Sequence, residues 1–256
     1  MKGQKRIVMI TSYDYPTAKV VSEIDAVDAI LVGDSLGMVV YGLPNTLGVT
    51  MEMMVRHTQA VARAKPPQLI VSDMPFMSYE TSTRDAVLNA GDLVRAGADA
   101  VKLEGGEEMA DVIRAIVRAG IPVMGHIGMT PQRFLRLGGF RVIGKRQNER
   151  EQLLRDAESL ENAGVFSVVI ENTYADLAKE ITERLSVPSI CIGAGPHCDG
   201  QVLVLHDVLG LSESRPYFAK AYADLWTVIK DAVSEYANEV LDGTFPSKEH
   251  YKVSES

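Results

Sequence analysis

Residues 99–127 read DAVKLEGGEEMADVIRAIVRAGIPVMGHI, and this stretch holds one complete strand–helix–strand unit. DAVKLEG (99–105) and IPVMGHI (121–127) are nearly continuous in apolar residues, as strands buried on both faces of a parallel sheet are. The amphipathic run between them, 107–119, ends at Ala-Gly, which is typical of the end of a helix. The stretch therefore predicts two parallel strands joined by a helix.

The same alternation continues in both directions along the chain. The other apolar runs predicted to be strands are RIVMITS (6–12), DAILVGD (28–34), QLIVSD (68–73), FSVVIEN (166–172), SICIGAG (189–195) and QVLVLHD (201–207). The other predicted helices are 82–96, 150–163, 174–185 and a last one over about 217–241 with an apolar stripe. Eight strands alternating with helices predict an α/β fold, a single (β/α)8 TIM barrel spanning 1–256.

The connections between the predicted elements are unequal in length. The interval 195–201 is too short for a full helix, so one crossover is predicted to be abbreviated. The two long connections, 37–50 and 128–148, both follow strand ends. Because such loops lie over the C-terminal face of a barrel, we expect them to act as binding loops or lids.

Composition and charge narrow the class of protein. The net charge of −8 excludes a nucleic-acid-binding surface, because phosphate binding requires a basic one. No apolar run approaches the roughly 18 residues that span a bilayer, and the N-terminus leaves no room for a signal peptide, so we expect no membrane association and a cytoplasmic location. Cys191 and Cys198 form neither a disulfide framework nor a Cys-x-x-Cys pair, and we interpret them as free thiols.

Polar side chains gather where the predicted strands end. They are Asp34 and Ser35, Asp73, Lys102 and Glu104, His126, Glu171, and His206 with Asp207. The ends of parallel barrel strands converge on one rim, where active sites are built. A single strand-end Asp or Ser is as often the cap of the next helix. Acids and bases at six strand ends instead indicate a site, because clustering them is unfavourable unless a charge or a ligand compensates.

Three of these residues, Asp34, Asp73 and Glu104, predict a metal ion. Carboxylates on neighbouring strands repel one another unless a cation lies between them. Oxygen ligands favour Mg²⁺, ahead of Mn²⁺ or Ca²⁺, and Zn²⁺ is disfavoured because no Cys or paired His accompanies them. The carboxylate and keto oxygens of a 2-oxo acid can fill two open positions of such a metal.

Six motifs connect this pattern to a known family. They are VGDSLGM (32–38), DMPFMSY (73–79), VKLEGG (101–106), GHIGMTPQ (125–132), IGAGPHCDGQVLVLHDVLG (192–210) and FAK (218–220). In this order and spacing the chain resembles the ketopantoate hydroxymethyltransferases, over nearly its whole length. The resemblance implies transfer of a hydroxymethyl group from 5,10-methylenetetrahydrofolate to 3-methyl-2-oxobutanoate, which gives 2-dehydropantoate for pantothenate and coenzyme A biosynthesis. It also implies Mg²⁺, a metal-stabilised enolate and a homo-oligomer, typically a decamer.

The resemblance also implies roles for the strand-end residues. Asp34 and Asp73 become metal ligands that also meet the substrate, and Glu104 binds the metal directly or through water. Ser35 and Lys102 contact the substrate carboxylate. Glu171 takes the position of the catalytic base, and His126 lies near the substrate oxygens.

Alternative interpretations remain for both the residues and the protein. Glu171 can be part of a structural ion pair, His126 can be a positioning rather than a catalytic histidine, and Lys102 can pair with Glu104. The rival activity is that of an Mg²⁺-dependent 2-oxo acid lyase or mutase of the phosphoenolpyruvate mutase and isocitrate lyase superfamily. Those enzymes are expected to carry a KKCGH-like loop, which this sequence lacks. A rival of another class is a non-catalytic barrel that binds a keto acid.

Overall fold

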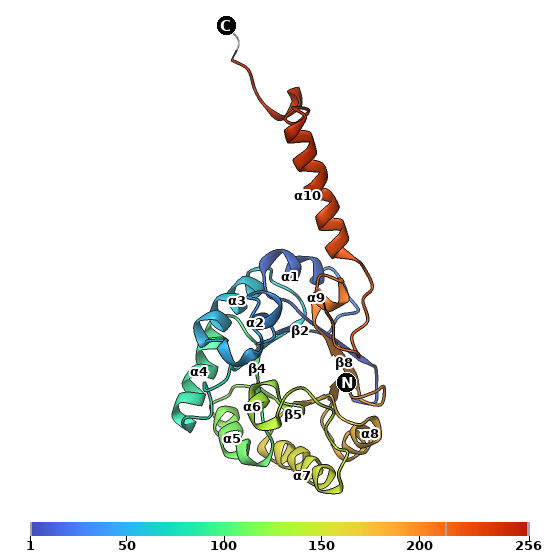
Figure 1. The fold of residues 1–256 in the computed structure, drawn as a ribbon. Coiled ribbons are helices and arrows are strands. Elements are labelled where there is room, and N and C mark those ends of the chain that lie inside the picture. The colour runs from blue at the N-terminus through green and yellow to red at the C-terminus, as the bar shows by residue number, and fades with distance from the viewer. Residues whose placement is uncertain (1, 213, 255–256) are drawn as a thin grey trace. The chain divides into compact units, whose positions relative to one another are not determined.

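The computed structural model describes residues 2–212 and 214–254, and its centre is a closed barrel of eight parallel strands (Figure 1). Each strand pairs with its neighbours in chain order, and β8 closes the barrel against β1. The strands are β1 (Ile7–Thr11), β2 (Ala29–Val32), β3 (Leu69–Asp73), β4 (Ala100–Glu104), β5 (Val123–Gly128), β6 (Ser167–Glu171), β7 (Ser189–Ile192) and β8 (Gly200–Leu203). The predicted (β/α)8 barrel is confirmed, and the predicted domain 1–256 includes four positions, 1, 213, 255 and 256, outside the described residues.

Alternate residues of each strand face two different apolar layers. One buried cluster contains Ala29 and Leu31 of β2, together with Val71, Ala100, Met124 and Val169 from the following strands. Ile30 and Val32 of β2 belong instead to the cluster packed against the helices. Because side chains alternate along a strand, the first cluster fills the barrel interior and the second joins the barrel to its helical layer.

This alternation decides which way the polar strand ends point. Asp73, Lys102, His126 and Glu171 each follow an interior residue by two positions, on β3, β4, β5 and β6. They therefore point to the same side as that residue, into the top of the barrel. A period of two along the strands thus brings the polar residues into one layer above an apolar interior.

Four helices around the barrel agree closely with the predicted ranges: α4 (Thr83–Arg95), α5 (Ala110–Arg118), α7 (Gln147–Ala163) and α8 (Ala175–Arg184). No range was predicted for the others, which are α1 (Tyr15–Val21), α2 (Leu36–Val39), α3 (Met51–Arg63) and α6 (Phe134–Leu137), with the 3-10 turns η1 (Thr46–Gly48), η2 (Glu107–Met109) and η3 (Pro131–Arg133). The short helix α9 (Leu205–Val208) follows β8 in the chain. Local chemistry sets several boundaries. The Ser82 side chain caps the start of α4, and Gly164 ends α7 in the left-handed conformation.

The chain beyond β8 differs from the prediction. The strand predicted for 201–207 stops at Leu203, and His206 and Asp207 lie on α9, so they are not strand-end residues. The last helix, α10 (Leu225–Leu241), begins eight residues later than the predicted 217–241. Its start is set by Asp224, whose side chain accepts a hydrogen bond from the Thr227 amide. A further 3-10 turn, η4 (Lys248–His250), follows it.

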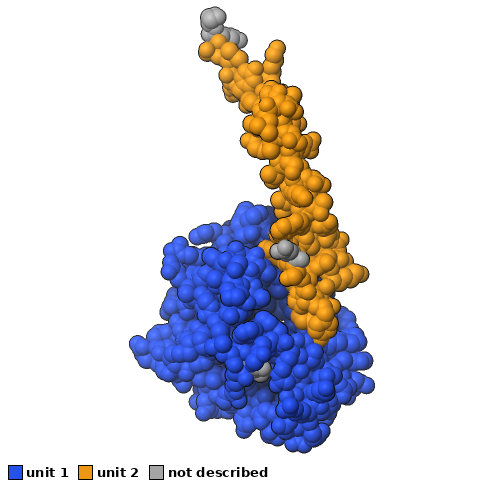
Figure 2. All heavy atoms as spheres, in the orientation of Figure 1, with its two compact units in different colours: residues 1–205 blue, residues 206–256 orange. Residues whose placement is uncertain are grey.

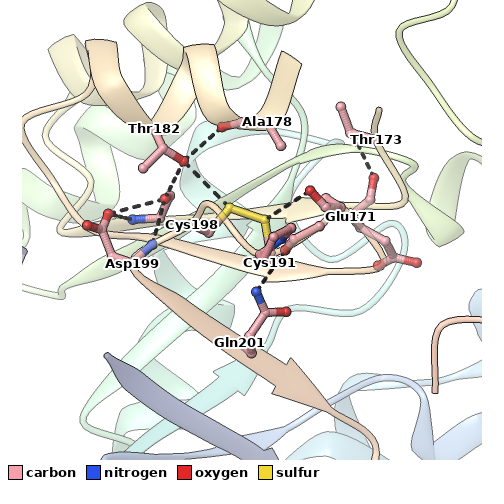
Figure 3. Close-up of a disulfide and its surroundings, with 12 residues drawn as sticks. Glu171, Thr173, Ala178, Thr182, Cys191, Cys198, Asp199 and Gln201 are labelled. Carbon is pink, nitrogen blue, oxygen red and sulfur yellow. Dashed lines mark hydrogen bonds between the residues drawn. A yellow bond between two sulfur atoms is a disulfide. The ribbon is translucent and has the colours of Figure 1, made fainter. Parts of the chain in front are cut away.

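Cys191 and Cys198 form a disulfide, so the interpretation of two free thiols is wrong (Figure 3). Cys191 lies on β7 and Cys198 just before β8, and the abbreviated crossover brings their Cα atoms to 5.7 Å, within the range that a disulfide spans. Thr182 of α8 donates a hydrogen bond toward the Cys198 sulfur at 3.5 Å.

The chain divides into two compact units, residues 1–205 and 206–256 (Figure 2). The first holds the barrel and all the helices that cover it. Within the second, α10 buries none of its side chains. No helix among the described residues is long and apolar enough to cross a membrane.

Candidate functional site

The three predicted metal ligands are buried at adjacent strand ends. Asp73 ends β3, Glu104 ends β4, and Asp34 lies in the turn after β2. Asp73 Oδ2 accepts a hydrogen bond of 2.9 Å from the Asp34 amide, which ties the first two together. Asp34 does not cap a helix: α2 begins after Ser35, whose side chain makes no capping hydrogen bond. The helix-cap alternative therefore does not account for this pair.

Lys102 supplies the positive charge within this cluster. Its Nζ atom lies 3.0 Å from Asp73 Oδ1 and is buried with it. The register of β3 and β4 explains the contact, because Asp73 and Lys102 are directly paired across the two strands. The sequence left open a pairing of Lys102 with Glu104, whereas the ion pair in the structure is with Asp73.

His126 links Lys102 to Glu171. Lys102 Nζ lies 3.3 Å from His126 Nδ1, and His126 Nε2 lies 3.2 Å from Glu171 Oε2. Because an ammonium only donates, Nδ1 must be the acceptor, and the proton of the neutral ring is then on Nε2, facing the carboxylate. Burial, together with the nearby Lys102, lowers the pKa of His126 well below its usual range, which favours this neutral form.

Burial also dominates the protonation of the acids. It raises the pKa of Asp73 to about 7 and the pKa values of Asp34 and Glu104 above their usual ranges, while Lys102 opposes each shift. Burial likewise raises the pKa of Glu171 to about 7, although its side chain keeps 17% of its surface exposed. A carboxylate that titrates near neutrality and remains accessible is suited to accept a proton.

The donor atoms suit a hard cation. Asp73 Oδ1 is buried beside the Lys102 ammonium, and Glu104 Oε1 is buried and accepts no hydrogen bond among the described residues. All three acids offer oxygen ligands, which Mg²⁺ prefers. No group of three or more His, Cys, Asp or Glu side chains in residues 2–212 and 214–254 is arranged to hold an ion by itself. Mg²⁺ commonly takes one or two carboxylates and completes its shell with water and substrate, so the residues present fit it.

Ser35 lies beside Asp34 with its hydroxyl engaged by a neighbour. Its Oγ atom is 2.8 Å from the hydroxyl of Tyr13, which is fully buried. Burial raises the pKa of Tyr13 above its usual range, so this hydroxyl stays protonated. The contact gives the Ser35 hydroxyl a buried partner, and its role toward a substrate stays a prediction.

Two buried residues in the cluster were not predicted as site residues, Gln132 and Tyr79. Gln132 Nε2 donates to Asp34 Oδ2 at 2.8 Å, and the Tyr79 hydroxyl donates to Gln132 Oε1 at 2.6 Å. Both residues stand at the ends of motifs that carried the family resemblance, GHIGMTPQ and DMPFMSY. Their place in these motifs was the one feature of the sequence that could have identified them as site residues. Neither residue is charged, and neither lies at a predicted strand end.

A steric requirement at Gly128 directs the long connection that carries Gln132. Gly128 has a φ of +95°, and a Cβ atom there would lie 2.3 Å from the Glu171 carbonyl oxygen. Only glycine fits so close to a neighbouring backbone. The next amide, of Met129, donates to that same carbonyl, so the connection leaves β5 against the end of β6.

The connection 128–148 also borders a cavity of about 710 Å³. Its lining includes Gly105 and Gly106, which directly follow Glu104, and four arginines, Arg133, Arg136, Arg141 and Arg155. Arg133 pairs with Glu108 and Arg141 with Glu149. The cavity therefore begins at the residues that follow Glu104 in the chain, and its lining does not include Asp34, Asp73, Glu104 or Glu171.

Comparisons with known proteins show the family to which the chain is similar. Residues 1–248 match the family model described as ketopantoate hydroxymethyltransferase. The chain is 67% identical over 253 residues to the 3-methyl-2-oxobutanoate hydroxymethyltransferase of Sulfurisphaera tokodaii, covering 99% of this chain and 94% of that protein. It is also 67% identical over 255 residues to the Sulfolobus acidocaldarius protein of the same name, covering 100% and 95%.

Solved structures share the fold at much lower identity. A phosphonopyruvate hydrolase matches with a TM-score of 0.64 and 12% identity, covering 99% of this chain and 89% of that one. A 2,3-dimethylmalate lyase, a member of the PEP mutase/isocitrate lyase superfamily, matches with a TM-score of 0.63 and 16% identity, covering 98% and 88%. These likenesses support the barrel alone. The rival superfamily therefore shares the barrel fold with this chain at low sequence identity, whereas the relatives at 67% identity carry the hydroxymethyltransferase name.

Proposed function

The chain belongs to the ketopantoate hydroxymethyltransferase family, and we propose that it transfers a hydroxymethyl group from 5,10-methylenetetrahydrofolate to 3-methyl-2-oxobutanoate with Mg²⁺ as cofactor. The observation that carries the proposal is the continuous contact chain Asp73–Lys102–His126–Glu171 beside Asp34 and Glu104. It combines a site for a hard cation, a positive charge for a carboxylate and an accessible base in one layer.

Each residue has a task in this reaction. Asp34 and Asp73 would hold Mg²⁺, and Glu104 would hold it directly or through water. When bound, the metal places positive charge next to the substrate ketone, where negative charge develops. Lys102, with Ser35, holds the substrate carboxylate. These contacts orient C3 of the keto acid toward Glu171.

Glu171 removes the proton from C3. Its carboxylate has a pKa raised to about 7 by burial, so it is basic enough to accept a proton at neutral pH. Carbon C3 then bonds to the methylene carbon of the donor, and water provides the hydroxyl oxygen of the product. Both carbon–nitrogen bonds of that methylene group break, and tetrahydrofolate leaves with the proton from C3 and one proton from water on its two nitrogens. His126 Nε2 lies 3.2 Å from Glu171 Oε2, beside the base, and burial together with Lys102 favours the neutral imidazole.

The one-carbon donor would enter through the arginine-lined cavity. Tetrahydrofolate carriers bear carboxylates, which guanidinium groups bind well. Arg136 is exposed and has no ion pair with a described acid, so it is free to make this contact. Arg136→Ala is expected to raise the KM for the donor and to leave donor-independent proton exchange at C3 unchanged. An unaltered KM would remove this cavity from the proposal.

Turnover measurements test the activity directly. Formation of 2-dehydropantoate is expected only when 3-methyl-2-oxobutanoate, 5,10-methylenetetrahydrofolate and Mg²⁺ are all present. Cleavage of 2,3-dimethylmalate by the same preparation would favour the rival lyase class. Binding of the keto acid without exchange of its C3 hydrogen, in the presence of Mg²⁺, would favour a non-catalytic barrel.

We also propose a cytoplasmic homo-oligomer, a decamer by resemblance. The names of the relatives, which describe a biosynthetic step, support the location. The apolar side chains that α10 leaves unburied within its own unit support association. Light scattering coupled to size exclusion is expected to give a mass well above the 27.9 kDa of one chain.

A further inference from the structure

Gln132 contacts two of the three carboxylates from a single position. It lies on η3 in the 128–148 connection and keeps only 3% of its surface exposed. Its backbone amide donates to Glu104 Oε2 at 3.0 Å, and its side-chain Nε2 donates to Asp34 Oδ2 at 2.8 Å. No other contact described above joins these two acids.

The surroundings determine which way the Gln132 amide faces. Nε2 lies near two acceptors, Asp34 Oδ2 and the Met74 carbonyl at 2.9 Å, so it must be the nitrogen. If the amide were flipped, its oxygen would face these two acceptor oxygens, and no hydrogen bond would form to either. Tyr79 secures the other side, because its hydroxyl donates to Gln132 Oε1 while accepting from the Glu104 amide at 3.2 Å.

These bonds form a closed loop around the two carboxylates. The Glu104 amide donates to Tyr79, Tyr79 donates to Gln132, and Gln132 donates back to Glu104 and onward to Asp34. One oxygen of each acid is thereby held. The other Glu104 oxygen, Oε1, accepts no hydrogen bond among the described residues and is the one left for a ligand.

We propose that Gln132 is a positioning residue that orients Asp34 and Glu104 for the divalent cation, and that Tyr79 holds its amide in the working orientation. The inference rests on the proposed metal site. It also gives the 128–148 connection a role besides that of a possible lid. The connection positions the Gln132 side-chain amide beside the proposed metal ligands. Groups that orient metal ligands typically affect metal affinity by about 10–100-fold.

Gln132→Met in the full chain tests this inference. Methionine keeps the length and approximate volume of glutamine but cannot donate to Asp34, and the backbone bond to Glu104 is retained. Mn²⁺ titration followed by electron paramagnetic resonance, which counts free Mn²⁺, is expected to show a Kd about 10–100-fold higher than that of the unaltered protein. This measurement needs neither substrate nor turnover.

Tyr79→Phe provides a milder variant that removes one hydroxyl. It is expected to raise the Mn²⁺ Kd roughly fivefold, comparable to one neutral hydrogen bond. Because Tyr79 acts through Gln132, adding Tyr79→Phe to Gln132→Met is expected to change the Kd little further. If Gln132→Met does not fold, the Tyr79→Phe result decides: an unchanged Kd overturns the inference.

Gln68→Met is the matched control. Gln68 is also buried, and its Nε2 donates to the carbonyls of Val21 and Ile24. It precedes β3, at the opposite end of that strand from Asp73. The control is expected to lower thermal stability while leaving Mn²⁺ affinity unchanged. A loss of affinity in Gln68→Met equal to that in Gln132→Met would make the effect one of general stability, and the inference would fail.

Asp34→Asn separates this inference from the function on which it rests. If Asp34→Asn binds Mn²⁺ as tightly as the unaltered protein, the metal site itself is wrong. If Asp34→Asn loses binding and Gln132→Met retains it, the metal site stands and only the positioning role of Gln132 is overturned.

Discussion

The ends of β3 to β6 and the connection between β7 and β8 belong to one barrel, but they are held together differently. The first region contains an ion pair, a neutral histidine and acids with raised pKa values. The second contains a disulfide, with Thr182 near its Cys198 sulfur (Figure 3). The hydroxyls of Thr182 and Ser189 are joined by a hydrogen bond of 2.8 Å. The first region gathers several acids around one lysine, whereas in the second Asp199, which follows Cys198, pairs with Lys2 at 2.9 Å.

The difference indicates a division of tasks. Buried charges contribute little net stability, because the loss of hydration offsets their attraction, so their concentration at one set of strand ends points to a ligand. The β7–β8 crossover lacks a covering helix of its own, and the covalent bond constrains it instead. Changes in the first region should therefore alter chemistry, and changes in the second should alter stability.

The largest effect is expected from the metal ligands. Asp34→Asn and Asp73→Asn keep the size of each side chain but weaken cation binding, so Mg²⁺-dependent turnover should fall by at least about 10³-fold, equivalent to several kcal/mol. The control is Asp99→Asn at the start of β4, where the carboxylate accepts only from the Ile70 amide. Full activity in the presence of a chelator would show that the carboxylates have another role.

Loss of the base should affect chemistry without affecting binding. Glu171→Gln keeps hydrogen-bonding capacity but cannot accept the proton. Exchange of the C3 hydrogen in deuterated water, measured without the one-carbon donor, should fall roughly 10²–10⁴-fold. The affinity for 3-methyl-2-oxobutanoate should change little. Exchange at the unaltered rate would make Glu171 structural and leave His126 as the next candidate.

Lys102 should show the opposite signature. Lys102→Met removes the charge that meets the substrate carboxylate, so calorimetric titration should give an affinity weaker by about 1.5–3 kcal/mol. The variant should also unfold at a lower temperature, because Asp73 loses its buried partner. Unchanged keto acid affinity would mean that Lys102 serves only to neutralise the acids.

The rate of C3 exchange should depend on pH through Glu171. Burial raises the pKa of Glu171 to about 7, so the carboxyl stays protonated, and inactive as a base, to a higher pH than usual. The exchange rate should therefore rise through pH 7 and fall about tenfold per unit well below it. A flat profile between pH 5 and 8 would contradict the assignment, and Glu171→Gln should lack the rise.

The smallest effect on activity is expected from the disulfide. Reduction of Cys191–Cys198 opens a loop with a sequence separation of 7 and should lower the free energy of unfolding by about 2–3 kcal/mol in the chain-entropy description. Exchange at C3, assayed well below the unfolding temperature, should be unchanged. Reduction leaves both sulfur atoms in place. Cys191→Ala also removes a buried sulfur atom from the packing, so it should lower the free energy of unfolding further. If reduction slowed C3 exchange, the disulfide region would also affect the chemistry, and the proposed division of tasks would be wrong.

The sequence by itself determined the barrel and the layer in which the site is built. Apolar runs spaced by amphipathic ones predicted all eight strands, because parallel strands must be buried on both faces. The same period of two placed Asp73, Lys102, His126 and Glu171 above interior residues. Charged side chains at strand ends were visible because acids and bases are rare in an apolar context.

Only the tertiary structure decided which groups touch. Lys102 pairs with Asp73 because the register of β3 and β4 aligns them, and no spacing along one strand reveals that register. Gln132 reaches Asp34 across 98 positions of sequence, and a neutral amide leaves no periodic signal. Cys191 and Cys198 pair because a crossover without a helix brings β8 beside β7. Periodic burial is a local property that a sequence records, whereas partners across the barrel are set by how the whole chain closes.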